Sequence, residues 1–238
     1  MKIRNIIKLA PLYAVILSLI ILFAYLGTET VTVLTQNAVN TDRMTIIIDP
    51  GHGGIDTGAT SCTGVMESEI NLEIALKLND LLQLLGYQTK MIRTSDISIF
   101  TEGDSIAAKK ISDLKNRVQI VNETEKAVLI SIHQNYFPVE RYSGAQVFYH
   151  QIGESEQLAK FLQKNIVSTI NPGSNRQAKK ASGVYLLQNI QKTAVLVECG
   201  FLSNPEEERQ LRDATYQKKL CGVIASAVSS FLKENVMT

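Results

Sequence analysis

The stretch MTIIIDPGHGG, residues 44–54, decides the fold of this chain. Its first half is a short apolar run rich in isoleucine, which is typical of a strand that is buried on both faces of a sheet. Pro50 and Gly51 end the run, and the glycines on either side of His52 let the backbone turn tightly around it. The stretch therefore predicts a buried strand followed at once by a polar turn that presents a histidine.

The rest of residues 44–238 alternates between strand and helix patterns. Residues 68–85 place apolar side chains three and four positions apart, which predicts an amphipathic helix that ends at Gly86. Further helices are expected at residues 108–123, 154–170, 205–213 and 215–233, and further strands at 87–93, 127–133, 144–150, 183–187 and 193–199. This alternation predicts an α/β fold with an open, mostly parallel twisted sheet of about six strands and helices on both faces.

Residues 1–26 have the features of a membrane anchor or signal sequence. Basic residues precede an uncharged apolar run at residues 9–26, which is nearly long enough to cross the hydrocarbon core of a bilayer. Basic charge before the run predicts that the N-terminus stays inside and the remainder lies outside. The length of the run and the lack of an A-x-A site favour an uncleaved anchor, and a cleaved signal peptide is the alternative. Residues 27–43 are polar and predict a linker to the domain at 44–238.

Composition excludes some classes of function. Net charge is only +1, so no strongly basic surface is expected, and nucleic acid is not predicted as a partner. Cys62, Cys199 and Cys221 are odd in number and far apart, which matches neither a disulfide framework nor a metal-binding spacing.

Ionisable side chains stand at the ends of three predicted strands. His52 follows the first strand, His133 ends the strand at 127–133, and Glu198 lies near the end of the strand at 193–199. The carboxyl ends of parallel strands meet at one edge of the sheet, which is where open α/β folds place their sites. We therefore expect these three side chains to lie close together.

Two histidines at strand ends suggest a metal site. A catalytic zinc commonly takes two histidines and one carboxylate and leaves one position for water. The spacing is not H-E-x-x-H, so the ligands must come from separate elements. The carboxylate candidates are Glu67, Glu69, Asp56 and Glu198. Glu67 follows a loop that could fold back onto His52, but a helix dipole would also favour a carboxylate there without any metal. Spacing alone leaves the choice open.

Five blocks of the sequence occur in a fixed order: IIIDPGHGGIDTGA, ESEINLEIALKL, RTSD, SIHQN and VLVECGFLSNPEE. In that order they resemble the zinc-dependent N-acetylmuramoyl-L-alanine amidase family, the amidase-3 catalytic domain, over roughly residues 44–233. The resemblance implies that Zn²⁺ is bound by His52, Glu67 and His133 and that Glu198 is the catalytic residue. His150, the remaining histidine, matches no ligand of the family.

The resemblance implies a hydrolase that cleaves the amide bond between N-acetylmuramic acid and L-alanine in peptidoglycan. Glu198 would take the proton of the attacking water and then pass it to the leaving amine of L-alanine. The alternative for Glu198 is a structural carboxylate that caps the loop at residues 200–204. Asn135 would orient the substrate or a metal ligand. Cys62 departs from the family pattern, because it places a thiol in the loop at residues 59–66.

Less specific features of the sequence resemble the germination-specific amidases of spore-forming bacteria. They are the single N-terminal apolar segment, the lack of wall-binding repeats, and the stretches DLKNRV, YSGAQVFY and GVYLLQN. This resemblance implies a role in spore cortex maturation, through muramic lactam formation. The expected partners are peptidoglycan and, through the N-terminal segment, a membrane, while the need for an accessory protein stays open. The expected location is extracytoplasmic, either secreted or anchored at the outer face of a membrane such as the forespore envelope.

Two other functions fit parts of the sequence. A zinc peptidase of similar fold would need an arginine to bind the carboxylate of its substrate, and Arg93 is a candidate. A non-catalytic wall-binding protein would be expected to have lost a metal ligand or Glu198, and all four of these residues are present. The products released from purified peptidoglycan distinguish the three functions.

Overall fold

The computed structural model of the chain describes residues 17–18, 22 and 44–236. The chain divides into two compact units, Met1–Arg43 and Met44–Thr238. In the first unit the three described residues are helical, and the predicted membrane segment 9–26 and linker 27–43 otherwise lie outside the described residues. Within the part that the structure describes, no helix is both long enough and apolar enough to cross a membrane.

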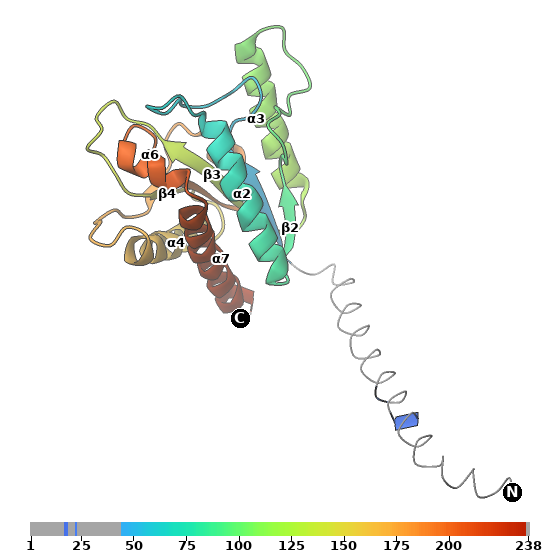
Figure 1. The fold of residues 1–238 in the computed structure, drawn as a ribbon. Coiled ribbons are helices and arrows are strands. Elements are labelled where there is room, and N and C mark those ends of the chain that lie inside the picture. Colours follow the sequence, from blue (N-terminus) through green and yellow to red (C-terminus); the bar gives the residue numbers. More distant parts are fainter. Residues whose placement is uncertain (1–16, 19–21, 23–43, 237–238) are drawn as a thin grey trace, which may run out of the picture. The chain divides into compact units, whose positions relative to one another are not determined.

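A sheet of six strands forms the centre of the second unit, in the order β2-β1-β3-β6-β4-β5 (Figure 1). The strands are β1 (Thr45–Pro50), β2 (Gln88–Met91), β3 (Ala127–Asn135), β4 (Gln146–Tyr149), β5 (Lys179–Lys180) and β6 (Thr193–Phe201). All neighbouring pairs are parallel except β4 and β6, which are antiparallel. The predicted open and mostly parallel sheet is confirmed.

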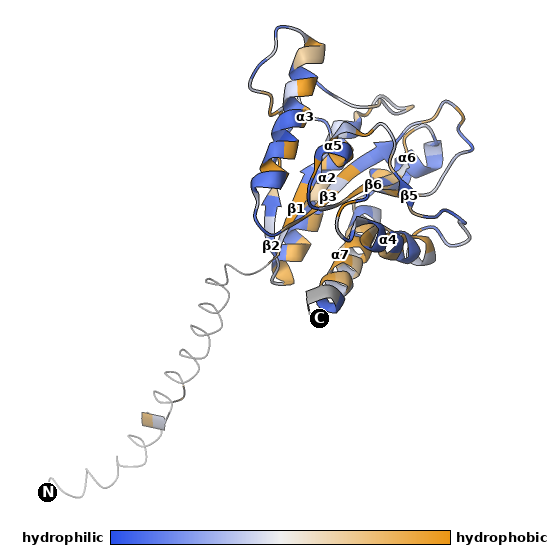
Figure 2. Cartoon of the chain, turned by 180° about the vertical axis from the view of Figure 1, so that it is seen from behind, coloured by the Kyte–Doolittle hydropathy of each residue, from blue (hydrophilic) through white to orange (hydrophobic). Residues whose placement is uncertain are grey.

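Helices cover both faces of this sheet. They are α2 (Glu67–Leu84), α3 (Ile106–Glu123), α4 (Ser155–Thr169), α5 (Tyr185–Asn189), α6 (Pro205–Leu211) and α7 (Ala214–Val236). The larger buried cluster packs α2, α4 and α7 against one face, where β1 contributes Ile46 and Ile48. The smaller cluster packs α3 and α5 against the opposite face, where β1 contributes Ile47. Because successive residues of a strand point to opposite faces, the isoleucine run supplies both cores, and Figure 2 shows hydrophobic strands between the helices.

The predicted strand at residues 183–187 is wrong, because Tyr185–Asn189 form the short helix α5. Leu186 and Leu187 are buried in the smaller core cluster, so this run is apolar because it packs against the sheet. A short apolar run fits a helix or a strand equally well by periodicity. The sixth strand is instead β5, whose two exposed lysines give no apolar signal.

Three adjacent strands carry their carboxyl ends to the same edge of the sheet. The register pairs Pro50 of β1 with Ile132 of β3, and it pairs His133 of β3 with Glu198 of β6. Neighbouring strands lie about 4.8 Å apart. The turn after β1 and the ends of β3 and β6 therefore meet at one place, as the sequence predicts.

Candidate metal centre

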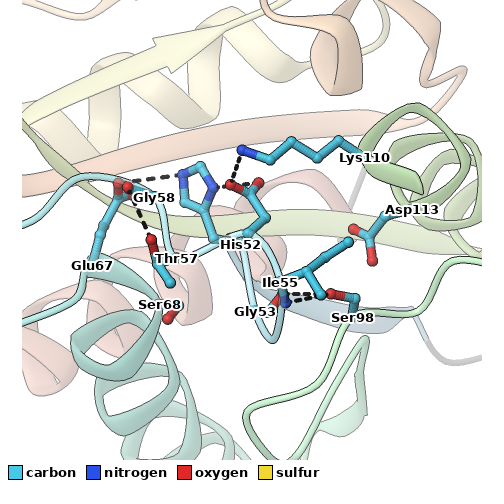
Figure 3. A network of polar contacts seen from close by, with 12 residues as sticks. His52, Gly53, Ile55, Thr57, Gly58, Glu67, Ser68, Ser98, Lys110 and Asp113 are labelled. Atoms are coloured by element: carbon cyan, nitrogen blue, oxygen red, sulfur yellow. Dashed lines mark hydrogen bonds and ion pairs between the residues drawn. The ribbon is translucent and has the colours of Figure 1, made fainter. Parts of the chain in front are cut away.

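His52 lies in the turn directly after β1. Its φ of 61° is in the left-handed region, and no other non-glycine residue in the described part of the chain has a positive φ. Such a conformation costs free energy and often marks a functional constraint. The ring nitrogen Nδ1 lies 2.8 Å from Oδ2 of Asp56, whose other oxygen lies 2.6 Å from Nζ of Lys110 (Figure 3). These contacts hold the ring so that its Nε2 lies 3.3 Å from Oε2 of Glu67.

Glu67 is the first residue of α2, and its side chain is almost completely buried. Its Oε2 accepts a hydrogen bond from the backbone nitrogen of Ala59 at 2.9 Å. Its Oε1 accepts from the backbone nitrogen of Gln134 at 3.1 Å and from Nδ2 of Asn71 at 3.2 Å. Nδ1 of His133 lies 3.0 Å from the same Oε1. A buried carboxylate is tolerable only with such partners, and here they fix both of its oxygens.

Two glycines leave the space that these side chains fill. A Cβ on Gly51 would lie 2.2 Å from the ring of His133, so only glycine fits beneath that ring. Gly58 has a φ of 68°, and a Cβ there would lie 2.5 Å from Oε2 of Glu67 and 2.7 Å from the ring of His52. The glycines in the DPGHGGIDTGA stretch therefore serve close approach as well as tight turning.

The structure brings His52, Glu67 and His133 together into one cluster. Each offers one ligand atom, and the three atoms lie within 4.8 Å of one another. Among the residues that the structure describes, no other group of His, Cys, Asp or Glu side chains meets that description. Two imidazoles and a carboxylate form the donor set of many catalytic zinc sites, so the residues present fit the zinc that the resemblance implies.

The electrostatics of the cluster also suit a cation. Burial alone would lower the pKa of His52, but its hydrogen bonds to Asp56 and Glu67 raise the pKa to about 9. Burial alone would raise the pKa of Glu67, but its contacts with His133 and His52 hold the pKa far below the ordinary value. The carboxylate is therefore ionised at neutral pH and favours a positive charge beside it, either a proton on His52 or a metal ion.

Glu198 lies on β6 beside His133, which is its register neighbour on β3. Its side chain is half-buried, and its Oε2 is fully enclosed without a hydrogen-bond partner among the described residues. Burial raises the pKa of Glu198 to about 7, and the charge of Glu67 adds to this effect while the imidazoles of His133 and His52 oppose it. Buried carboxylate oxygens are rarely left unpaired, so this oxygen lacks the hydrogen-bond donor that would favour its charged form.

The other side chains considered from the sequence lie outside the metal cluster. Asp56 contacts His52 but is not one of the three converging residues. Glu69 and Cys62 are exposed, and neither belongs to the cluster. Asn135 ends β3, and its backbone oxygen accepts a hydrogen bond from the backbone nitrogen of Leu202, which directly follows β6.

Arg93 is only 2% exposed, and its guanidinium group donates hydrogen bonds to four backbone carbonyl oxygens. It is therefore not placed to bind the carboxylate of a substrate, as the peptidase alternative requires.

Sequence reasoning missed Arg117 as a contributor to this site. Its guanidinium pairs with Asp49 and Asp113, each at 2.5 Å, and donates to the backbone oxygen of His52 at 2.7 Å. Asp49 also accepts a hydrogen bond from the hydroxyl group of Ser131 at 2.7 Å. The spacing of four between Asp113 and Arg117 was the available signal, but the same spacing is common in exposed helical pairs.

Two imidazoles and two carboxylates beside the carboxyl ends of neighbouring parallel strands are side chains of the kind that hydrolase sites use. The chain belongs to the N-acetylmuramoyl-L-alanine amidase family, whose sequence model matches residues 46–230. It is 38% identical over 191 residues to the germination-specific N-acetylmuramoyl-L-alanine amidase of Bacillus subtilis (strain 168), with 79% of this chain and 80% of that protein covered.

Solved structures of the family share the fold. The CwlD amidase from Clostridioides difficile, in complex with the GerS lipoprotein, is 36% identical with a TM-score of 0.77, covering 80% of this chain and 99% of that one. An N-acetylmuramoyl-L-alanine amidase from Clostridium difficile 630 is 31% identical with a TM-score of 0.70, covering 81% and 98%. The family resemblance predicted from the sequence is confirmed, and the chain is an amidase that acts on peptidoglycan.

Proposed function

We propose that this amidase is zinc-dependent, that His52, Glu67 and His133 bind the Zn²⁺, and that Glu198 carries the proton. The observation that supports this proposal most strongly is the convergence of three ligand atoms within 4.8 Å of one another, from a turn, a helix start and a strand end. The carboxyl group of Glu198, on the neighbouring strand and with its pKa raised to about 7, adds the second component of a hydrolytic site.

Each of these side chains has a definable task in the reaction. Zinc, when bound, supplies a Lewis acid that polarises the scissile carbonyl and makes a water molecule more acidic. Glu198 accepts the proton of the attacking water on its carboxylate and delivers it to the nitrogen of L-alanine as the amide bond breaks. A pKa near 7 lets one carboxyl group act as base and then as acid. Asp56 holds His52 by its Nδ1, which keeps Nε2 available for the metal.

The substrate within the cell is inferred to be the peptidoglycan of the spore cortex. The relative from Bacillus subtilis is named germination-specific, which supports this setting. Removing the stem peptide frees the lactyl carboxyl group of muramic acid, which is the group that closes the ring in muramic lactam formation. Cortex maturation in a spore-forming bacterium is therefore the proposed role.

The proposed location follows from the substrate and the N-terminal sequence. Peptidoglycan lies outside the cytoplasm, and residues 1–26 are proposed to export the chain or anchor it at the outer face of a membrane such as the forespore envelope. Residues 27–43 then link that segment to the catalytic domain at 44–238. Because the CwlD relative was solved with a lipoprotein, a lipoprotein is the accessory partner that we propose to test for.

The reaction is tested by incubating the purified protein with purified peptidoglycan and analysing the products by mass spectrometry. We expect new free amino termini on L-alanine, no new reducing sugar ends, and loss of both binding of zinc and cleavage in His133→Ala. Cleavage that continues undiminished after complete removal of metal would contradict the zinc dependence. Release of amino acids from peptide C-termini would instead identify a peptidase.

A further inference from the structure

Arg93 occupies an unusual position for a charged side chain. It lies two residues beyond β2 and is 2% exposed. Its Nε donates to the backbone oxygen of Pro50 at 2.9 Å, and its Nη1 donates to that of Ser95 at 3.0 Å. Its Nη2 donates to two carbonyl oxygens at once, Gly51 at 3.0 Å and Ser68 at 2.8 Å.

The two carbonyls that share Nη2 belong to the backbone on either side of the metal cluster. Gly51 directly precedes His52, and Ser68 directly follows Glu67. One nitrogen atom of Arg93 therefore joins the turn that carries His52 to the first turn of α2, which carries Glu67. The guanidinium is planar and rigid, so it fixes the directions and the separation of the groups that it binds.

The same turn is held from a second side. Arg117 of α3 is 3% exposed and donates to the backbone oxygens of Pro50 at 3.0 Å and His52 at 2.7 Å. The left-handed backbone of His52 persists only where surrounding contacts over-determine it, and the two arginines together supply such contacts. Both arginines bind the turn, and Arg93 also binds the backbone oxygen of Ser68, next to Glu67.

We propose that Arg93 is a positioning residue that sets the separation of His52 and Glu67 before zinc arrives, and so raises the affinity of the site for zinc. This inference rests on the proposed zinc site. Lysine at this position keeps the positive charge but offers one compact ammonium group, which cannot donate along the three directions that the guanidinium uses. The charge and the geometry of Arg93 can therefore be tested separately.

The test measures zinc affinity by competition with a chromophoric chelator for the wild type, Arg93→Lys and a control, Gln217→Met. Gln217 is fully buried and donates to the backbone oxygen of Leu211 at 2.7 Å, so the control also loses a buried bond to a carbonyl. We expect Arg93→Lys to bind zinc about 10- to 100-fold more weakly, as is usual when a residue that orients a ligand is lost. The visible spectrum of the cobalt-substituted protein should change in Arg93→Lys and not in Gln217→Met.

Wild-type zinc affinity in Arg93→Lys, or an equal loss of affinity in Gln217→Met, would overturn the proposal. The variant His133→Ala tests the proposed zinc site independently of Arg93. If His133→Ala loses zinc and Arg93→Lys does not, the zinc site is supported and only the proposed role of Arg93 is wrong.

A measurement on the wild type covers the case in which Arg93→Lys does not fold. In the metal-free protein labelled with ¹⁵N-arginine, the Nη protons of Arg93 should exchange slowly with solvent, because Arg93 is proposed to make its hydrogen bonds before zinc binds. Fast exchange that slows only when zinc is added would contradict the proposal.

Discussion

Replacing Glu198 with glutamine is expected to stabilise the metal-free protein while it removes catalysis. The substitution keeps the size and shape of the side chain but removes its charge and its basicity. Glu198 has a buried, unpartnered carboxylate oxygen, so its charged form is unfavourable in the fold. A residue retained for catalysis at a cost in stability is expected to behave in this way.

The size of the effect follows from the pKa of Glu198. Burial raises this pKa from an ordinary value of 4.5 to about 7 in the folded protein. Each pKa unit corresponds to about 1.4 kcal/mol, so the charged form destabilises the fold by about 3 kcal/mol. Below pH 4.5 the group is protonated in both states and the penalty is absent. As the pH rises from 4.5 to 7 the unfolded chain loses its proton first, so the penalty grows and is complete above pH 7.

The assay is thermal unfolding of chelator-treated protein at several pH values from 4.5 to 8. Glu198→Gln should unfold about 6–12 °C above the wild type at pH 8, since 1 kcal/mol shifts the midpoint by roughly 2–4 °C in a chain of this size. The difference should vanish towards pH 4.5. Glu69→Gln is the matched control, because Glu69 is an exposed carboxylate on α2, and we expect no comparable pH-dependent gain.

A structural role for Glu198 predicts the opposite result. If Glu198→Gln unfolds at a lower temperature than the wild type at pH 8, the carboxylate stabilises the fold and the reasoning above is refuted. The loss of an acid–base group lowers the rate by about 10²–10⁴-fold, so a variant that keeps more than about a tenth of wild-type cleavage would also refute it.

Three further predictions follow from the site and the N-terminal sequence. His52 holds a proton up to its pKa of about 9, and zinc must displace this proton. The affinity for zinc should therefore rise by about tenfold per pH unit between pH 7 and 9, and zinc binding should release protons that calorimetry can measure. An affinity that does not depend on pH would contradict this. Gly58→Ala should lower both the unfolding temperature and the zinc content, because Gly58 has a left-handed backbone and the added Cβ would collide with Glu67. Gly64 also has a positive φ, but a Cβ there meets no atom within 4 Å, so Gly64→Ala should keep its zinc. Residues 9–26 should keep the full chain in the membrane pellet after an alkaline carbonate wash, and a mature N-terminus near residue 28 would show a cleaved signal instead.

The sequence predicted the main strands because their environment leaves a clear pattern. Strands β1, β3 and β6 are buried on both faces, so they appear as continuous apolar runs. The run at residues 183–187, which overlaps α5, is also apolar but has only five residues, which is too short for periodicity to separate helix from strand. Its identity depends on packing against the sheet, which the local sequence does not encode.

The candidate site was predictable in part for a related reason. His52 follows β1, His133 and Glu198 lie near the carboxyl ends of β3 and β6, and the topology of a parallel sheet brings these ends together. Glu67 reaches the cluster from a helix start after a loop, so spacing alone could not select it from the other carboxylates.

The contacts of Arg93 and Arg117 with the turn around His52 could not be predicted, because both arginines bind its backbone carbonyl oxygens from distant parts of the chain. Bonds to a backbone atom leave no pairing pattern among side-chain types.

The central claim is that three side chains hold the metal and a fourth moves the proton. Zinc content and amide cleavage, measured on the same samples of wild type, His133→Ala and Glu198→Gln, test it most directly. We predict that the wild type holds zinc and cleaves, that His133→Ala loses both, and that Glu198→Gln retains zinc at the wild-type level but loses nearly all cleavage. Near-stoichiometric zinc in His133→Ala, or loss of zinc in Glu198→Gln, would contradict the account.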